Sequence, residues 1–204
     1  STGKFYEPSS NKMVIGTSAT QPWNSVIGGS GASAKPYTVT AWIYIDESAD
    51  GGTSNMIIAF GGYSRRIWWT QNKIQADILG TSNTGYVATP ANAVMPGRWY
   101  HIAFVYTGGD PGGSNTQNYM KMYIDGVAQT VYVAGELNNP ASINESLSTN
   151  KSNIGMAKDS NYPFWGLITE LGVFARALTD AEILEIYNLK KPSGGLYSIN
   201  DTGI

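Results

Sequence analysis

The run FWGLITELGVFARALTDAEILEIYNL, residues 164–189, changes from a strand pattern to a helix pattern. Its first part carries bulky apolar side chains from Trp165 to Phe174 and is interrupted by Gly166 and Gly172. Glycines inside a strand pattern are typical of a β-bulge or of a close approach between backbones. The first part therefore predicts a long strand with a local irregularity.

The second part of the run carries the start signal of a helix. Thr179 can act as an N-cap, and Glu182 follows three residues later, which is the spacing of a capping box. Apolar residues then recur at helical intervals, at Ile183, Ile186 and Tyr187. The sequence predicts one short helix, at about 179–189, attached directly to the long last strand.

Three earlier segments have the patterns of core strands. They are YTVTAWIYI at 37–45, RWYHIAFVY at 98–106 and KMYIDGVAQ at 121–129, the last with an Asp-Gly turn. Together with the closing run, and in the same order and spacing over about 37–189, they resemble laminin G-like, concanavalin A-like jelly-roll domains. The resemblance implies an all-β fold, a two-sheet antiparallel jelly-roll sandwich with one short C-terminal helix.

Composition favours the same architecture independently. The chain has 204 residues with 24 Gly and 12% aromatic residues, which suits one sandwich domain, predicted over 1–191, with 192–204 as a tail or arm. Clusters of Gly, Asn, Ser, Thr and Pro separate the candidate strands. These candidates are 12–16, 37–45, 56–60, 66–70, 74–79, 98–106, 119–124, 127–133 and 165–174.

Charge and hydropathy exclude several partners. The net charge is -2 and the basic residues are scattered, so we expect no nucleic-acid partner, and the pair Arg65 and Arg66 is interpreted as solvated surface. No apolar run has the roughly 18 to 20 residues of a membrane helix, so we expect no membrane insertion. Cysteine is absent, which excludes disulfides and thiolate metal sites.

The first residues, STGKFYEPSS, show no signal peptide. The resembled family occurs mostly outside cells, so the expected location is extracellular or on a virion surface. A bacteriophage virion protein, assembled in the cytoplasm and acting after lysis, fits these features. A piece of a longer secreted protein fits them equally well.

Signs of catalysis are weak. Sandwich glycosidases place two carboxylates close together on one strand, whereas here Asp77 stands alone in its strand and Glu170 is the one acid of the last strand. The single histidine, His101, lies inside a strand and is interpreted as a hydrogen-bonded structural imidazole. We expect no enzyme, with a polysaccharide-active enzyme as the minor alternative.

Aromatic side chains carry the binding hypothesis. Trp68 and Trp69 are adjacent in a strand, so their rings point to opposite faces and one of them is expected to face away from the core. Three interpretations of an outward ring are open: it stacks on a sugar, it contacts a protein partner, or a neighbouring loop covers it. The candidate ligand-binding residues are Trp68, Trp69, Tyr63, Tyr86 and Trp23.

The resemblance also implies a check for calcium, which laminin G-like domains often bind at a sheet rim. Many relatives have two acids after the Gly-x-Ile of the last strand, whereas this chain reads GLITEL and retains only Glu170. Asp46 and Asp77 would have to assist, because calcium takes six to eight oxygen ligands. Calcium is possible, but we expect no tight site and no other cofactor.

The sequence thus predicts a non-enzymatic, surface-displayed recognition or adhesion module whose leading activity is carbohydrate binding. A bacteriophage virion structural protein, used for capsid decoration or associated with a fibre, is the alternative. The partner is a glycan or a protein surface. Contacts with further copies or with virion neighbours are possible, for which the tail at 192–204 has apolar residues.

Overall fold

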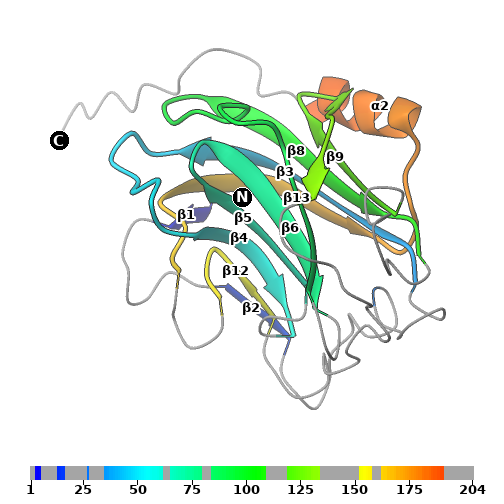
Figure 1. Cartoon of the computed structure of the whole chain (residues 1–204), viewed down its shortest axis with the longest axis horizontal. Helices are drawn as coiled ribbons and strands as arrows, with labels where there is room; N and C mark the ends of the chain where they lie inside the picture. Colours follow the sequence, from blue (N-terminus) through cyan, green and yellow to red (C-terminus); the bar gives the residue numbers. More distant parts are fainter. Residues whose placement is uncertain are drawn as a thin grey trace, which may run out of the picture.

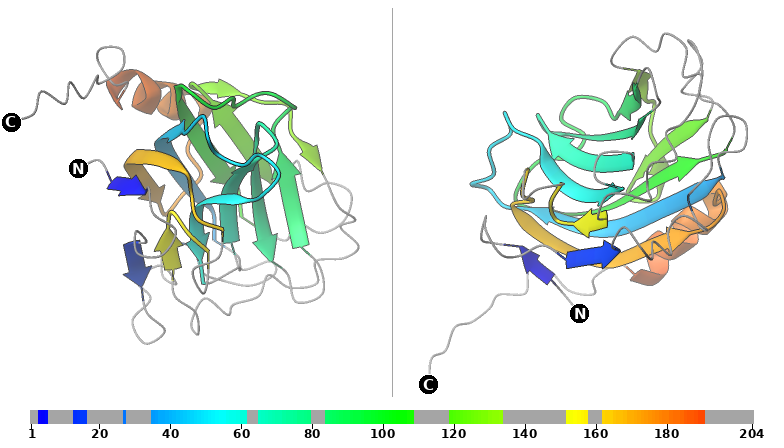
Figure 2. Two further views of the ribbon diagram at one scale, coloured as in Figure 1. Left: turned by 90° about the vertical axis from the view of Figure 1, so that its left-hand side faces the viewer. Right: turned by 90° about the horizontal axis from the view of Figure 1, so that it is seen from below.

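The computed structural model describes residues 3–5, 13–16, 27, 35–61, 65–79, 84–108, 119–133, 152–157 and 162–190. In these residues the chain forms antiparallel sheets that pack face to face, with a helix on the outer side of one sheet (Figures 1 and 2). The predicted all-β sandwich with a C-terminal helix is therefore confirmed. The predicted tail at 192–204 lies outside the described residues.

Sheet A contains the predicted closing strand near one edge and the predicted strands of 37–45 and 98–106 at its middle. In spatial order its strands are β1 (Gly3–Phe5), β13 (Gly166–Phe174), β3 (Tyr37–Ile45), β8 (Trp99–Tyr106), β9 (Met120–Ile124) and β10 (Val127–Ala128). Consecutive neighbours in this order pair antiparallel.

Sheet B is built around one hairpin and the strands on either side of it. In spatial order its strands are β11 (Tyr132–Val133), β7 (Thr84–Ala88), β6 (Lys73–Leu79), β5 (Arg65–Thr70), β4 (Asn55–Phe60), β12 (Ser152–Ile154) and β2 (Met13–Gly16). The turn between β5 and β6 consists of Gln71 and Asn72, with φ values of 49° and 59°. Two consecutive positive φ values are the geometry of a type I′ hairpin turn.

One predicted strand, at 127–133, is two short strands in the structure. Residues 127–133 do not form one strand, because β10 pairs with β9 in sheet A while β11 pairs with β7 in sheet B. The chain therefore crosses between the layers within this segment. The short strands β1, β7 and β12 were not predicted. β1 and β12 have three residues each, too few for an alternating pattern, and in β7 (TGYVA) Gly85 interrupts the pattern.

The core lies between the two sheets and follows the alternation of side chains along each strand. From β3 it receives Val39, Ala41 and Ile43, and from β5 it receives Ile67 and Trp69, all of them buried. The other parity points outward on both sheets. The outer faces of the two sheets therefore differ from the core in composition, and they differ from each other in what covers them.

The irregularity predicted for the last strand is present. The register of β13 against β3 shifts between Thr169 and Gly172, and Glu170 within this bulge has a φ of 51°. At the start of the strand, a Cβ on Gly166 would clash with the carbonyl oxygen of Tyr44. Both predicted features of glycine in this strand, the bulge and the close approach, are therefore confirmed.

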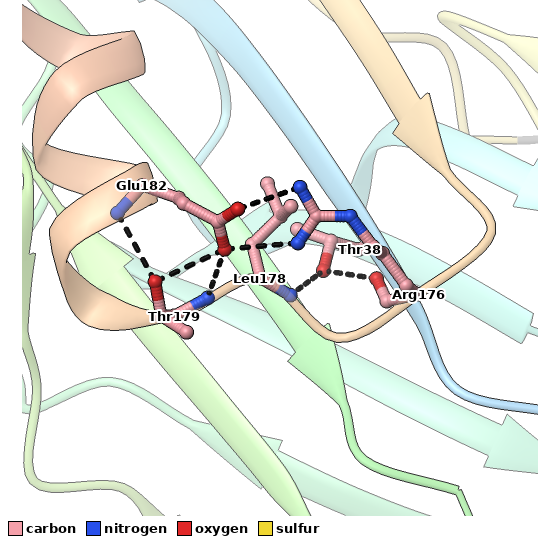
Figure 3. Close-up of polar contacts among 5 residues, drawn as sticks. All are labelled: Thr38, Arg176, Leu178, Thr179 and Glu182. Atoms are coloured by element: carbon pink, nitrogen blue, oxygen red, sulfur yellow. Dashed lines mark hydrogen bonds and ion pairs between the residues drawn. The ribbon is translucent and has the colours of Figure 1, made fainter.

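Helix α2 (Asp180–Lys190) begins where the capping box predicted (Figure 3). The Thr179 hydroxyl accepts a hydrogen bond from the Glu182 amide at 3.3 Å, and Glu182 in return accepts one from the Thr179 amide at 2.8 Å. Arg176 adds two hydrogen bonds to the Glu182 carboxylate. Together these contacts hold the pKa of Glu182 down at about 2, with the Arg176 bonds as the largest cause.

The loop before α2 is fastened to sheet A by one threonine of β3. The hydroxyl of Thr38 donates to the carbonyl of Arg176 and accepts from the amide of Leu178, both at 2.9 Å (Figure 3). The helix then packs on the outer face of sheet A through a small apolar cluster. Its buried members are Ala103, Val105, Tyr123, Leu178 and Ile183.

His101 lies under this helix, and the structure corrects its interpretation. The side chain is buried at 1% exposure, but neither ring nitrogen has a hydrogen-bond partner among the residues that the structure describes. The imidazole instead packs against the stacked rings of Trp42 and Tyr187, with centroids 5.5 and 5.9 Å away. It is a structural residue held by aromatic packing rather than by hydrogen bonds.

Across the described part of the chain, none of the helical segments is both long enough and apolar enough to cross a membrane.

Candidate functional site

The adjacent tryptophans of β5 point to opposite sides of sheet B. Trp69 is 1% exposed, belongs to the core between the sheets, and donates its indole N–H to the carbonyl of Val94 at 2.8 Å. Trp68 is partly exposed on the outer face. As predicted, one of the two rings faces away from the core. Trp69 is therefore a core residue and not a ligand-binding one. The sequence could not distinguish the two, because alternation separates the two faces of a strand without saying which face is the inner one.

Trp68 lies in an open groove on the outer face of sheet B, with a volume of about 440 Å³. Its walls come from β5, β6 and β7, from the β5–β6 turn and from the loop before β4. The lining residues are Ser54, Arg66, Trp68, Thr70, Gln71, Gln75, Asp77 and Tyr86. The groove brings together two of the predicted ligand-binding residues, Trp68 and Tyr86.

Strand register explains why these side chains meet. Trp68 is directly opposite Gln75, and Asp77 lies between Arg66 on one side and Tyr86 on the other. Side chains directly opposite one another on an antiparallel sheet have Cβ atoms about 5 Å apart. Three strands thus present one continuous row of outward groups across the sheet.

The aromatic part of the groove is a tilted ring pair. The ring centroids of Trp68 and Tyr86 are 6.4 Å apart with an interplanar angle of 40°. On its other side Trp68 packs against the buried residues Met56, Ala59 and Ala157. The indole is therefore supported from behind while part of it remains accessible in the groove.

The charged part of the groove is a close ion pair. The Arg66 Nε lies 3.0 and 2.9 Å from the two carboxylate oxygens of Asp77, and Nη2 pairs with Oδ2 as well. The side chain of Asp77 is 1% exposed and that of Arg66 is 25% exposed. Burial raises the pKa of Asp77, and Arg66 opposes this rise by hydrogen bonding to the ionised carboxylate. The pair corrects the interpretation of Arg66 as solvated surface. The same interpretation was wrong for its neighbour Arg65, which is buried at 1% exposure.

The remaining polar groups of the groove are uncharged. The side-chain amides of Gln71 and Gln75 make no hydrogen bond within the described residues. Each such amide offers a carbonyl acceptor and an N–H₂ donor. Thr70 donates its hydroxyl to the carbonyl of Gly51 at 3.2 Å and retains acceptor capacity. The groove thus presents two accessible amides next to an aromatic pair.

The other predicted site residues lie elsewhere. Tyr63 and Trp23 are outside the described residues. Asp46 follows β3 and accepts hydrogen bonds from the amide and the hydroxyl of Ser48, while Glu170 sits in the bulge of β13. Neither acid lines the groove that contains Asp77. In the described ranges no three His, Cys, Asp or Glu residues are grouped as metal ligands, so the possible calcium set is not brought together.

Sequence reasoning missed Arg66, Thr70, Gln75 and Ser54 as groove residues. Arg66 and Thr70 share the parity of Trp68 along β5, which is a usable signal once Trp68 is taken as outward. Gln75 is identified only through the register of β6 against β5. Ser54 comes from a loop, for which no periodic signal exists.

Solved structures with a similar fold are binding domains. The binding domain of botulinum neurotoxin serotype G has a TM-score of 0.58 and 12% identity over 90% of this chain and 42% of its own. The binding domain of botulinum neurotoxin DC, solved with rat synaptotagmin II, has a TM-score of 0.51 and 18% identity over 76% of this chain. This chain spans only 36% of that second toxin domain.

A third similar structure covers a comparable length. The Ruminococcus gnavus IT-sialidase CBM40, solved with α2,3-sialyllactose, has a TM-score of 0.53 and 13% identity over 75% of this chain and 83% of its own. At these identities the likeness concerns the fold.

A search of curated protein sequences found no relative of this chain. The family comparison is decisive, because the model of one superfamily matches residues 20–184, which is more than half of the 204 residues. The fold, the strand order and this match agree, and the chain belongs to the concanavalin A-like lectin/glucanase superfamily.

Proposed function

We propose that this protein is a non-enzymatic carbohydrate-recognition module, displayed outside the cell or on a virion surface, and that it binds sugars in the groove on sheet B. The observation that carries the proposal is the pairing of Trp68 and Tyr86 with the accessible amides of Gln71 and Gln75. Pyranose rings have an apolar C–H face that stacks on aromatic rings and a rim of hydroxyls that pair with amides.

The groove is suited to binding rather than to hydrolysis. Cleavage of a glycosidic bond ordinarily uses two carboxyl groups, about 5 Å apart or farther, on either side of the bond. Among the described lining residues, the groove contains the carboxylate of Asp77, which Arg66 engages. Similar folds solved as binding domains, one of them with sialyllactose, support the same class of function.

The decisive test is Trp68→Ala, with glycan binding followed on an array and by calorimetry. Removal of the indole deletes the stacking surface, so we expect affinity for any bound glycan to fall by about tenfold or more. Trp99→Ala is the matched control, because Trp99 is also partly exposed and lies on the outer face of sheet A beside Tyr44. Equal binding by both variants would contradict the proposal.

A second candidate is a structural subunit that acts through protein contacts, as in a virion. The observation that favours it is an exposed apolar surface formed by helix α2 and strand β10. Leu184 is 46% exposed, Leu189 is 71% exposed and Val127 is 60% exposed. Leu184 lies close to Gly126, the residue before Val127, so the two apolar side chains belong to one region. We name this region, Val127 and Leu184, the α2–β10 surface; Leu189 is five positions further along the helix and points about 140° away from Leu184.

A further inference from the structure

The charge of the groove has a consequence for the class of sugar that it accepts. Taking the proposed carbohydrate function as given, we infer that the groove selects neutral glycans over acidic ones and that Asp77 is the residue that determines this selectivity. Two of the described lining residues carry a formal charge, Arg66 and Asp77, and they form an ion pair with each other. The groove therefore offers a glycan no net charge.

Arg66 is the group that would receive a sugar carboxylate, and Asp77 already holds it. A guanidinium recognises a carboxylate best through two parallel N–H donors. In this groove Nε and Nη2 of Arg66 both face Asp77. An acidic sugar would have to share this guanidinium with a carboxylate of this same protein, which is tethered to the neighbouring strand directly opposite Arg66.

Burial makes this sharing costly. Asp77 is 1% exposed, so its charge is poorly solvated and depends on Arg66 for compensation. A second carboxylate brought to the same guanidinium would lie close to Asp77, and like charges in a poorly solvated site repel strongly. An acidic glycan therefore loses an attraction and gains a repulsion, whereas a neutral one meets neither. This is selectivity by exclusion of the wrong ligand.

The groups that remain suit hydroxyl-bearing, uncharged rings. Trp68 and Tyr86 supply apolar ring surface, and the amides of Gln71 and Gln75 supply donors and acceptors without charge. Arg66 itself lies beside the indole, with its Cζ 5.2 Å from the ring centroid. Its guanidinium is thus fixed both by Asp77 and by Trp68, and it forms part of the wall.

The first experiment uses the unmodified protein on an array of matched pairs. Each neutral oligosaccharide is spotted beside the same chain bearing a terminal sialic acid, and polygalacturonate is spotted beside its fully methyl-esterified, uncharged form. We expect the neutral member to bind at least about tenfold more tightly, with little dependence on salt. Tighter or equal binding of the acidic members overturns the inference while leaving carbohydrate binding intact. Absence of binding to every glycan overturns the proposed function and the inference with it.

The second experiment alters the ion pair. Asp77→Asn removes the carboxylate that faces Nε and Nη2 of Arg66, so the ratio of acidic to neutral binding should rise by about tenfold or more and should fall again at high salt. Asp125→Asn is the matched control, because Asp125 pairs with Arg98 at 3.8 Å outside the groove and the substitution makes the same change in net charge. An equal rise in both variants, or none in Asp77→Asn, contradicts the inference. Thermal unfolding establishes that each variant is folded, and the array with unmodified protein decides the matter if Asp77→Asn is not.

Discussion

At the scale of single residues, His101 shows how a polar group is tolerated in an apolar place. Its ring lies under helix α2 among Trp42 and Tyr187, and burial lowers its pKa to about 4. The indole N–H of Trp42 is also buried, with no hydrogen-bond partner in the described part of the chain. A neutral imidazole is accepted here, whereas a charged one would lose its hydration without gaining a partner.

This arrangement predicts a loss of stability in mild acid. The unfolded chain protonates His101 near pH 6.5, whereas the folded chain does so only near pH 4. Between these values the unfolded state binds more protons, so the free energy of unfolding should fall as the pH falls from 6.5 to 4, by about 3 kcal/mol from this residue. Urea unfolding as a function of pH measures it. In His101→Phe this part of the slope should vanish, and an unchanged slope would show that other groups cause the effect.

The sequence predicted which residues of a strand share a face, but it did not predict which of the two faces lies against the core. Alternation correctly set Trp68 against Trp69, yet it could not say which ring enters the core, because that depends on where the second sheet lies. Arg66 was misread as solvated because its partner Asp77 is close only through strand pairing. Trp68 and Tyr86 were nevertheless both identified as candidate site residues, and they do lie in the same groove.

At the scale of elements, helix α2 depends on its first turn. The capping box of Thr179 and Glu182, braced by Arg176, satisfies backbone groups that would otherwise lack partners (Figure 3). Tyr123 also donates a hydrogen bond to Asp180 at 2.7 Å. The helix has only 11 residues, and isolated helices of this length are marginal in water. Its attachment to sheet A therefore supplies stability that its length does not.

Thr179→Ala should weaken this attachment. The substitution removes the hydroxyl that caps the Glu182 amide, and loss of such a cap typically costs about 1 kcal/mol. Denaturant unfolding followed by circular dichroism measures the change. Thr130→Ala is a suitable control, because Thr130 is exposed in a segment without helix or strand. Equal stability of the two variants would mean that Arg176 and Thr38 hold the helix start without the cap.

Long alternating segments were the elements that the sequence predicted best. Strands β3, β8 and β13 and helix α2 were placed within a residue or so, because their apolar patterns extend over eight or more positions. The division of 127–133 between two sheets was not predictable in this way. It depends on β7, a short strand about 40 residues earlier in the chain, which is available as the partner of β11.

At the scale of the whole molecule, the two outer faces differ. That of sheet A is partly covered by helix α2 (Figure 2), whereas that of sheet B carries the open groove. The α2–β10 surface and the groove consequently lie on different sheets. A protein contact at the first and a glycan at the second are therefore compatible in one molecule.

The structural-subunit candidate makes a separable prediction about assembly. Leu184→Glu places a charge on the α2–β10 surface, so any self-association of the protein should be lost, as measured by sedimentation velocity at increasing concentration. Met95→Glu is the matched control, because Met95 is similarly exposed, at 43%, but lies in the loop before β8. Leu184→Glu sedimenting like the unmodified protein would dismiss this surface as a contact between copies.

Strand β5 also bears on how readily such a protein acquires new specificities. Residues 65, 67 and 69 are buried, whereas 66, 68 and 70 are not. Selection therefore acts on packing at the first set and on ligand contact at the second. Substitutions at the second set can diversify recognition while the interior keeps its shape. An inserted residue, by contrast, would exchange the two sets and damage both together. Divergence in this lineage is therefore expected to proceed at these positions by replacement and not by changes in length.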